Sequence, residues 1–253
     1  MHEDNIIEEF ISDIKTKAGK NPNIAILTGA GISAESGLQT FRGEGGLWCG
    51  HHVEDVATPQ AFIRNPILVH QFYNERRNGL FSDDVAPNDA HKALARLQSK
   101  HRGKVTLITQ NIDDLHERGG TTEVIHMHGE VCMSFCIHCH TKAPQRQDSS
   151  IEDICASCKV KGGMRPDIVW FGEMPYHMDK IDAALSKADL FVSIGTSGNV
   201  YPAAGFVLMA ANAGAGTLEI NLEPSKNAHV FDCGMYGAAS QEVPRFVAAL
   251  LEE

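Results

Sequence analysis

The apolar residues of this chain fall into short continuous runs separated by stretches with helical periodicity. The runs lie at residues 23–28, 105–109, 189–195 and 216–221. Continuous apolar runs that alternate with helices are typical of strands buried on both faces of a parallel sheet. The pattern predicts an α/β fold with a Rossmann-like core.

Four stretches repeat apolar positions at helical spacing, namely residues 6–18, 88–100, 201–214 and 240–253. Asn88 is suited to cap the second of these helices, and Gly214 to end the third. We also expect a helix at residues 67–80.

Residues 132–165 break the pattern, because they are rich in Cys, His and Lys and hold no long apolar run. The pairs Cys136-x2-Cys139 and Cys155-x2-Cys158 are separated by fifteen residues. Four thiolates in two such pairs suit the tetrahedral coordination of Zn²⁺, and they leave no position open for substrate. We predict a structural zinc; four unrelated thiols or a redox pair are the alternatives.

A glycine-rich turn, GAGISA at residues 29–34, follows the first apolar run and matches G-x-G-x-x-G/A. Glycines at this position allow a close approach of a pyrophosphate. The alternative is an ordinary glycine-rich turn. A dehydrogenase would place an acidic residue about 20 positions further on at a strand end, but residues 40–56 resemble a loop. Asn221 and Glu223, beside the last run, are better candidates to contact a ribose, which makes hydride transfer a poor fit.

Polar residues also follow the run at 105–109. Gln110, Asn111 and Asp113 stand where ligands bind in open α/β sheets. His126 and His128 end another short β-like stretch. An amide, a carboxylate and a histidine at strand ends could form a general-base site; each alone could equally be a structural residue.

Composition narrows the class of protein. The 253 residues include 22 Lys+Arg and 32 Asp+Glu, so 22 − 32 gives a net charge of −10. An acidic chain lacks the basic surface that a nucleic-acid backbone requires, whereas it would attract a cationic protein tail. No apolar run approaches the roughly 18–20 residues that span a bilayer. The acidic N-terminus resembles neither a signal nor a transit peptide, so we expect a cytoplasmic protein.

The motifs, taken in order, make a larger pattern. They are GAGIS (29–33), TFR (40–42), TQNID (109–113), HG (128–129), the four cysteines, FGE (171–173), GTS (195–197) and NLE (221–223). In this order and spacing the chain resembles the sirtuin family of NAD-dependent protein lysine deacylases, most closely its bacterial CobB-type branch. The resemblance implies one catalytic domain, 1–253, with a Rossmann-like core (20–131 and 166–250), a zinc insert (132–165) and a helical insert (43–85).

The resemblance implies an NAD site, whose residues divide by the part of the cofactor that they face. Near the phosphates would be Gly29, Ala30, Gly31 and Ser33, beside a loop with Phe41 and Arg42. On the adenosine side would be Gly195, Thr196, Ser197, Asn221, Leu222, Glu223 and Ala239. Around the nicotinamide would be Gln110, Asn111 and Asp113, with Ala34, Glu35, Trp48 and Ile112 completing the set.

The reaction is implied in the same way. His128 would be the general base, and Asn111 and Asp113 further catalytic residues. The acyl-lysine of a protein substrate would pair by strand addition with the segment that contains Val169, Phe171 and Gly172. Nicotinamide and O-acyl-ADP-ribose would be released.

Tyr73 and Arg76 bear on the choice of acyl group. They are three residues apart, so on a helix they share one face. Arg can bind a carboxylate with two hydrogen bonds, and Tyr adds another donor. A Tyr-x-x-Arg pair in this segment characterises the sirtuins that remove succinyl and malonyl groups, so we expect those activities, with deacetylation retained. The alternative is a surface Arg76 paired with Glu75.

The chain departs from the sirtuin pattern at two places, and three alternatives to a protein deacylase stay open. Gln39 and Thr40 stand where many sirtuins have Pro-Asp, and His126 in the HMHG sequence could be mistaken for the base. The alternatives are a sirtuin-fold ADP-ribosyltransferase, a catalytically silent NAD or acyl-lysine binding module, and a zinc-knuckle nucleic-acid binder, which the charge disfavours. We expect a monomer.

Overall fold

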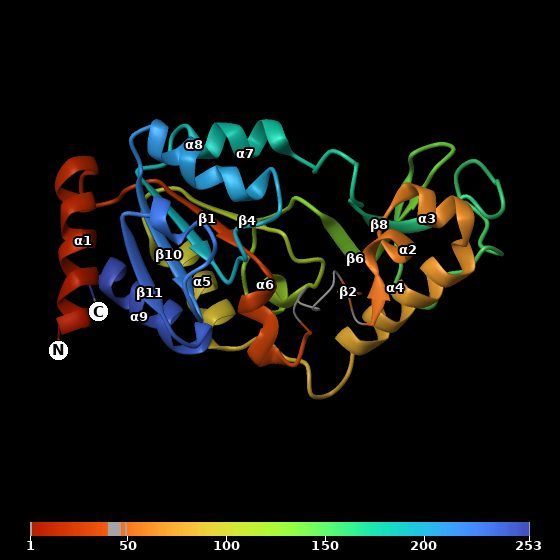
Figure 1. Cartoon of the computed structure of the whole chain (residues 1–253), viewed down its shortest axis with the longest axis horizontal. Helices are drawn as coiled ribbons and strands as arrows, with labels where there is room; N and C mark the ends of the chain where they lie inside the picture. The colour runs from red at the N-terminus through yellow and green to blue at the C-terminus, as the bar shows by residue number, and fades with distance from the viewer. Residues whose placement is uncertain (1, 40–46, 49, 253) are drawn as a thin grey trace.

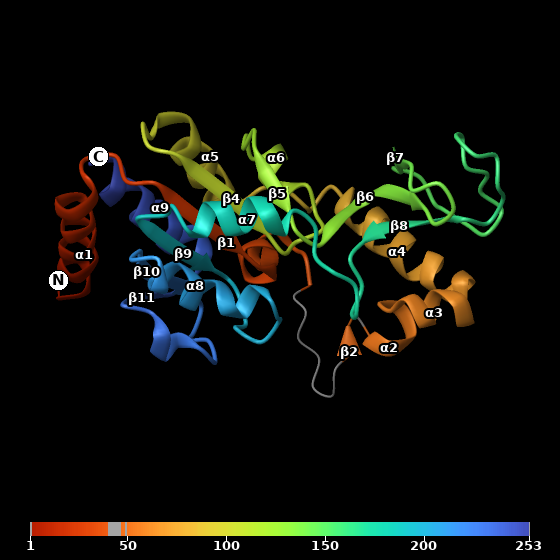
Figure 2. The ribbon, with the colours of Figure 1, turned by 90° about the horizontal axis from the view of Figure 1, so that it is seen from above.

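The computed structural model describes residues 2–39, 47–48 and 50–252. Its main feature is a sheet in which all neighbouring strands are parallel. The strands lie in the order β11 (Cys233–Tyr236), β10 (Gly216–Asn221), β9 (Leu190–Ile194), β1 (Ile24–Thr28), β4 (Val105–Thr109) and β5 (Val124–His126). The chain builds outward from β1 in one direction through β4 and β5, and then from β9 in the other; Figures 1 and 2 together label all of these strands. The strand order therefore reverses between β1 and β9.

Helices cover both faces of this sheet, as predicted. On one face pack α1 (His2–Ala18), α5 (Asp89–Lys100) and α9 (Ala239–Leu251). On the other pack α7 (Met178–Leu185) and α8 (Phe206–Asn212), drawn above the sheet in Figure 1. Side chains of β1 alternate between the two cores, with Ile26 in the first and Leu27 in the second. Both faces are thus apolar, which explains the continuous apolar runs.

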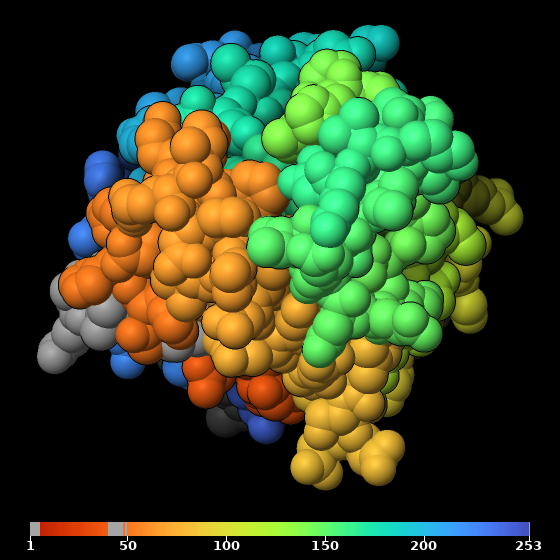
Figure 3. All heavy atoms as spheres, turned by 90° about the vertical axis from the view of Figure 1, so that its right-hand side faces the viewer, coloured from red at the N-terminus to blue at the C-terminus, as the bar shows by residue number. Residues whose placement is uncertain are grey.

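A second, smaller group of elements lies at the end of the molecule away from α1 (Figure 2). It consists of α2 (Val53–Val56), α3 (Pro59–Arg64), α4 (Pro66–Leu80) and an antiparallel sheet of β7 (Lys142–Pro144), β6 (Gly129–Cys136) and β8 (Met164–Ile168). In Figure 3 the residues of these helices (orange) lie beside the segment that contains the four cysteines, residues 132–165 (green). Val69, Phe72, Val131, Ile168 and Trp170 share one apolar core there. We call this group the small lobe, and the parallel sheet with its helices the large lobe.

The remaining elements are short: η1 (Ala30–Ser36), η2 (Ala203–Gly205) and η3 (Ala228–Val230), which are 3₁₀ helices, α6 (Leu115–Arg118), and the hairpin of β2 (Leu47–Trp48) with β3 (His51–His52). The glycine-rich turn therefore leads into a 3₁₀ helix. Part of the expected loop at 40–56 forms the hairpin and α2. No helix in the described ranges is long and apolar enough to span a membrane.

The predicted helix ends are confirmed. Asn88 caps α5, because its side-chain oxygen accepts a hydrogen bond of 2.9 Å from the backbone N–H of Ala90. Gly214 follows α8 in the left-handed region, with φ +95°. Strand β11 and the antiparallel strands were not predicted, because they are short or, in β6 and β8, mix apolar with polar residues.

The two lobes meet where β6 begins. Gly129 is at φ +82°, which disfavours other residues, and a Cβ atom at this position would overlap the carbonyl oxygen of Asp167. Glycine is thus required for β6 and β8 to pair at this point.

We expect Gly129→Ala to reduce the free energy of unfolding by about 3 kcal/mol or more, since it adds overlap to backbone strain. Gly214→Ala is the matched control, because its φ is also positive but no atom lies within 4 Å of the added Cβ. The control should cost about 1–2 kcal/mol. Urea unfolding of both variants measures the difference; equal losses would refute this account of Gly129.

Candidate active site

Two glycine loops meet at the point where the strand order reverses. Gly29 follows β1 and Gly195 follows β9. The N–H of Gly31 donates to the carbonyl oxygen of Gly195 over 2.9 Å, and a Cβ atom at Gly31 would lie 2.7 Å from the Cα of Gly195. Such a crevice at the carboxyl ends of parallel strands is the usual place for a nucleotide.

A cavity of about 710 Å³ runs from these loops to the small lobe. Within the described chain, it brings together nearly all residues that the sequence predicted to bind NAD or substrate: Gly29, Ala30, Gly31, Ser33, Ala34, Glu35, Trp48, Tyr73, Arg76, Gln110, Asn111, Ile112, Asp113, His128, Val169, Phe171, Gly172, Gly195, Thr196, Ser197, Asn221, Leu222 and Ala239. Glu223 does not line it, and Phe41 and Arg42 lie outside the described residues. Trp170, Val131 and Tyr201 line it as well, although no local signal in the sequence marked them.

Three polar side chains form one wall of the cavity. Ser33 accepts a hydrogen bond from the side-chain amide of Asn111 and donates one to Asp113, both over 3.1 Å. Burial raises the pKa of Asp113 to about 6, although hydrogen bonds from the Leu115 N–H and from Ser33 oppose the shift. The pKa of Asp113 is therefore raised toward neutrality. Its carboxyl group holds the side chain of Ser33, which in turn holds the side chain of Asn111.

His128, between β5 and β6, also lines the cavity. Its Nδ1 is 3.2 Å from the backbone oxygen of Gln110, which can only accept, so Nδ1 carries the hydrogen. Burial lowers the pKa of His128, and the bond to Gln110 opposes this only in part. The imidazole is therefore neutral at pH 7, with the Nε2 lone pair free to accept a proton.

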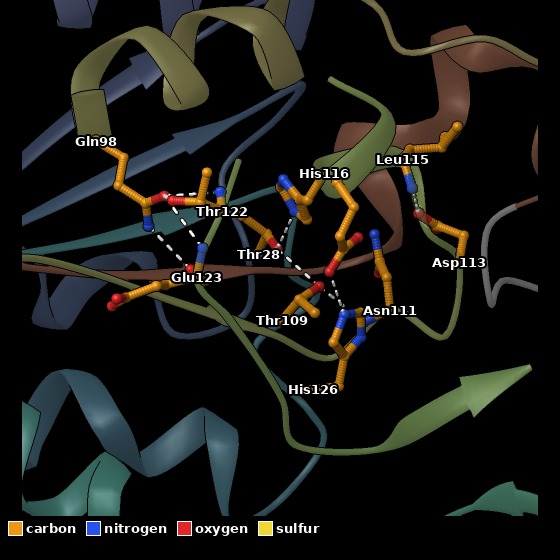
Figure 4. A network of polar contacts seen from close by, with 11 residues as sticks. Thr28, Gln98, Thr109, Asn111, Asp113, Leu115, His116, Thr122, Glu123 and His126 are labelled. Atoms are coloured by element: carbon orange, nitrogen blue, oxygen red, sulfur yellow. Dashed lines mark hydrogen bonds and ion pairs between the residues drawn. The ribbon is translucent and has the colours of Figure 1, made fainter. Parts of the chain in front are cut away.

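A buried hydrogen-bonded row supports the turn after β4 (Figure 4). His116 contacts Thr28 through Nε2 over 2.9 Å, Thr28 donates to Thr109 over 2.9 Å, and Thr109 accepts the backbone N–H of Asn111 over 3.0 Å. Burial lowers the pKa of His116 to about 3 and that of neighbouring His91 to about 4. These histidines are therefore neutral and buried beneath the wall of the cavity.

His126 has a different role from His128. Its Nε2 lies 2.7 Å from a carboxylate oxygen of Glu117, and it does not line the cavity. Burial alone would lower the pKa of His126, but the bond and charge of Glu117 outweigh burial and raise it. Of these two histidines, only His128 lines the cavity.

The far end of the cavity lies in the small lobe, beside α4. Arg76 donates through Nη1 to the backbone oxygen of Phe72 over 2.8 Å, and its guanidinium lies 3.9 Å from the centre of the Phe72 ring. The contact of Arg76 with the exposed Glu75 carboxylate is longer, 3.5 Å. Arg77 points elsewhere and is fully buried, where it donates to the Val131 carbonyl. Nε and Nη2 of Arg76 have no hydrogen-bond partner among the described residues, so they can donate to a ligand.

The four cysteines of the small lobe form one cluster. The sulfur atoms of Cys136 and Cys158 are 3.7 Å apart, those of Cys139 and Cys155 are 3.6 Å apart, and all four lie within 4.8 Å of one another. A tetrahedral Zn²⁺ with bonds of about 2.3 Å requires sulfur atoms about 3.8 Å apart. The cluster fits a structural zinc, as predicted.

The fold and cavity define a dinucleotide-binding α/β protein with a structural metal lobe. The Sir2 family profile matches residues 29–202, and the chain belongs to this family. An NAD-dependent protein deacylase of Bdellovibrio bacteriovorus is 54% identical over 91% of this chain and 97% of its own length. One of Vibrio cholerae is 56% identical over 90% and 93%.

Solved structures agree with this assignment. A Sir2 homologue in complex with NAD has a TM-score of 0.84 and 36% identity, with 95% of this chain and 93% of its own covered. Sir2Af2 bound to a myristoylated histone peptide has a TM-score of 0.75 and 30% identity, with 100% and 98% covered. NAD is thus the cosubstrate for which the cavity of this family member is built.

We expect removal of zinc, by a chelator or by Cys139→Ser, to lower the melting temperature by about 10 °C, because the polar segment around the cluster has little core of its own. Cys233→Ser, outside the cluster, is the control and should bind a full equivalent of zinc. Metal analysis together with thermal unfolding gives both quantities. An unchanged melting temperature after complete loss of zinc would contradict a structural role.

We also expect acid to destabilise the protein through His91 and His116. Their folded pKa values lie below the value of about 6.5 in an unfolded chain, so stability is lost as the pH falls below 6.5. Each of these two histidines should lower the free energy of unfolding by about 2 kcal/mol at pH 5. His116→Gln keeps an N–H for Thr28 and should lose less stability between pH 7 and pH 5. Urea unfolding at the two pH values checks this, and equal losses would contradict it.

Proposed function

We propose that this protein removes succinyl and malonyl groups, and acetyl groups as well, from lysine side chains of proteins, releasing nicotinamide and O-acyl-ADP-ribose. The broader activity, NAD-dependent protein deacylation, accompanies membership of the family at the identities given above. The observation that carries the narrower proposal is that Tyr73 and Arg76 line the same cavity as His128.

The residues around the glycine loops would hold NAD, which supplies a ribose carbon that carries nicotinamide as a leaving group. The backbone of Gly29 to Ser33 allows the phosphates to approach closely. Ser33, Asn111 and Asp113, held in place by the hydrogen bonds among them, would contact the nicotinamide ribose. His128 would accept a proton from a ribose hydroxyl at Nε2, and its neutral state at pH 7 suits that role.

Arg76 and Tyr73 would recognise the acid end of the acyl group. A carboxylate offers Arg76 a closer partner than Glu75, whose oxygen is 3.5 Å away and whose side chain is 67% exposed. Arg76 itself is only 19% exposed, so an anionic ligand gains from the reduced screening around it. An acetyl group is too short to use these donors, so its turnover depends on the rest of the cavity.

The peptide backbone of the substrate would pair with the segment from Val169 to Gly172. The N–H groups of Val169 and Phe171 already donate to the carbonyl oxygens of His128 and Ala57. The backbone N–H and carbonyl of Trp170, on the opposite edge, bond to Glu173. The substrate would therefore pair with the remaining backbone groups of the segment, such as those of Gly172, and the acyl-lysine would then lie next to His128.

We expect Arg76→Met to lower kcat/KM for a succinyl-lysine peptide roughly 10- to 100-fold and to change that for the acetyl peptide less than about threefold, because only the acid loses a charged partner. Arg64→Met, at an exposed site outside the cavity, is the matched control. His128→Ala should lower both activities by about 100-fold or more. Mass spectrometry of the peptide and nicotinamide release measure these rates.

Other outcomes would decide against the proposal. Equal losses for both acyl groups in Arg76→Met would make Arg76 structural. NAD cleavage with no peptide deacylation by the wild type would favour the ADP-ribosyltransferase alternative. Binding of NAD without any product would favour a silent binding module.

A further inference from the structure

The hydroxyl group of Tyr73 has one hydrogen-bond partner in the described part of the chain. Trp170, 97 residues away in sequence, donates its indole N–H to Tyr73 Oη over 2.9 Å. An indole nitrogen can only donate, so Tyr73 is the acceptor in this bond. The hydrogen of the Tyr73 hydroxyl is therefore left without an acceptor among the described residues, although the side chain is fully buried.

A buried donor without an acceptor is costly unless a ligand or water accepts from it. The hydrogen of a phenol lies near the plane of the ring, on one side of the oxygen or the other. Because the indole N–H of Trp170 donates to the Tyr73 oxygen, the hydroxyl hydrogen cannot point toward Trp170 and is turned away from it. Burial also raises the pKa of Tyr73, which keeps the group protonated at neutral pH.

Trp170 is itself held firmly. The guanidinium of Arg165 lies 3.5 Å from the centre of its ring, and Phe62 packs against the ring with centroids 5.5 Å apart. Arg165 makes two hydrogen bonds of 2.8 Å to Glu173, and Glu173 also accepts the backbone N–H of Trp170 over 2.9 Å. The indole N–H therefore has a fixed position relative to α4.

We propose that Trp170 is a positioning residue for acyl selectivity, which directs the hydroxyl hydrogen of Tyr73 into the acyl end of the cavity. Both side chains line that cavity, together with Arg76. The carboxylate of a succinyl or malonyl group supplies the missing acceptor, whereas the methyl group of an acetyl does not. This inference rests on the proposed function, because it explains how one of the two acid-binding donors is oriented.

The experiment compares the wild type with Trp170→Phe, Tyr73→Phe and the double variant on succinyl and acetyl peptides. Each single variant should lower kcat/KM for the succinyl peptide about tenfold through KM, and change the acetyl reaction less than about threefold. The double variant should be no worse than Tyr73→Phe alone, because Trp170 acts through Tyr73. KM for NAD should stay the same in all of them.

Two further variants separate positioning from packing. Phe62→Leu loosens the packing against Trp170 without touching the hydrogen bond, so it should lower the melting temperature and leave the succinyl-to-acetyl ratio unchanged. Trp170→His retains an N–H on a flat ring, so it should keep more succinyl activity than Trp170→Phe does. If Trp170→Phe proves unstable, Trp170→His can be compared directly with the wild type.

Several results would overturn the inference. If Trp170→Phe lowers both reactions equally, as a packing defect would, Trp170 has no part in selectivity. If the losses of the two single variants multiply in the double variant, Trp170 acts independently of Tyr73. A wild type that does not turn over the succinyl peptide at all would instead refute the proposed acid preference, and the inference with it.

Discussion

The close approach of β6 and β8 at Gly129 is the constraint on which the site depends. His128 is the residue before this point, and the segment from Val169 to Glu173 leaves the end of β8 beside it. The N–H of Val169 donates to the carbonyl of His128 over 2.9 Å, so the histidine and the segment proposed to bind substrate share one rigid junction. The two lobes also meet at this junction, and residues on both sides of it, His128 and Val169, line the cavity.

Polar groups of the cavity wall are buried, and they are satisfied largely by one another. Ser33, Asn111 and Asp113 form one such set, and the row from His116 to Thr109 holds the backbone that carries Asn111. Groups fixed in this manner need little rearrangement when a ligand arrives. Tyr73 and Arg76 differ from this set, because each retains donor capacity that the described residues do not use in full.

Much of the fold could be predicted from the sequence because its signals are local. The apolar runs of β1, β4, β9 and β10 and the spacing of Cys136, Cys139, Cys155 and Cys158 need no knowledge of distant contacts. Strand β7 escaped prediction because it has only three residues, and β6 and β8 because they mix apolar with polar residues and lie beside the cysteine-rich segment. Strand β11 escaped because only Met235 of its four residues is buried.

The site was predictable to a similar extent. Residues that follow strands, such as Asn111 and Asp113, could be placed at the sheet edge, since the carboxyl ends of parallel strands share one edge. The hydrogen bond from Trp170 to Tyr73 could not be foreseen, because the two residues are 97 positions apart in the sequence and come together only in the folded small lobe. The low pKa values of His91 and His116 likewise arise from burial, which the sequence alone does not reveal.

The two-lobed construction separates two properties of the protein. The glycine loops and the Ser33 set come from the large lobe, whereas Tyr73, Arg76 and Trp170 come from the small one. Under the proposed function, changes in α4 or after β8 would therefore alter which acyl group is accepted while the nucleotide-facing loops stay intact. A lineage that descends from such an architecture would diversify its acyl choice by ordinary point mutations, without passing through ancestors that have lost their cofactor.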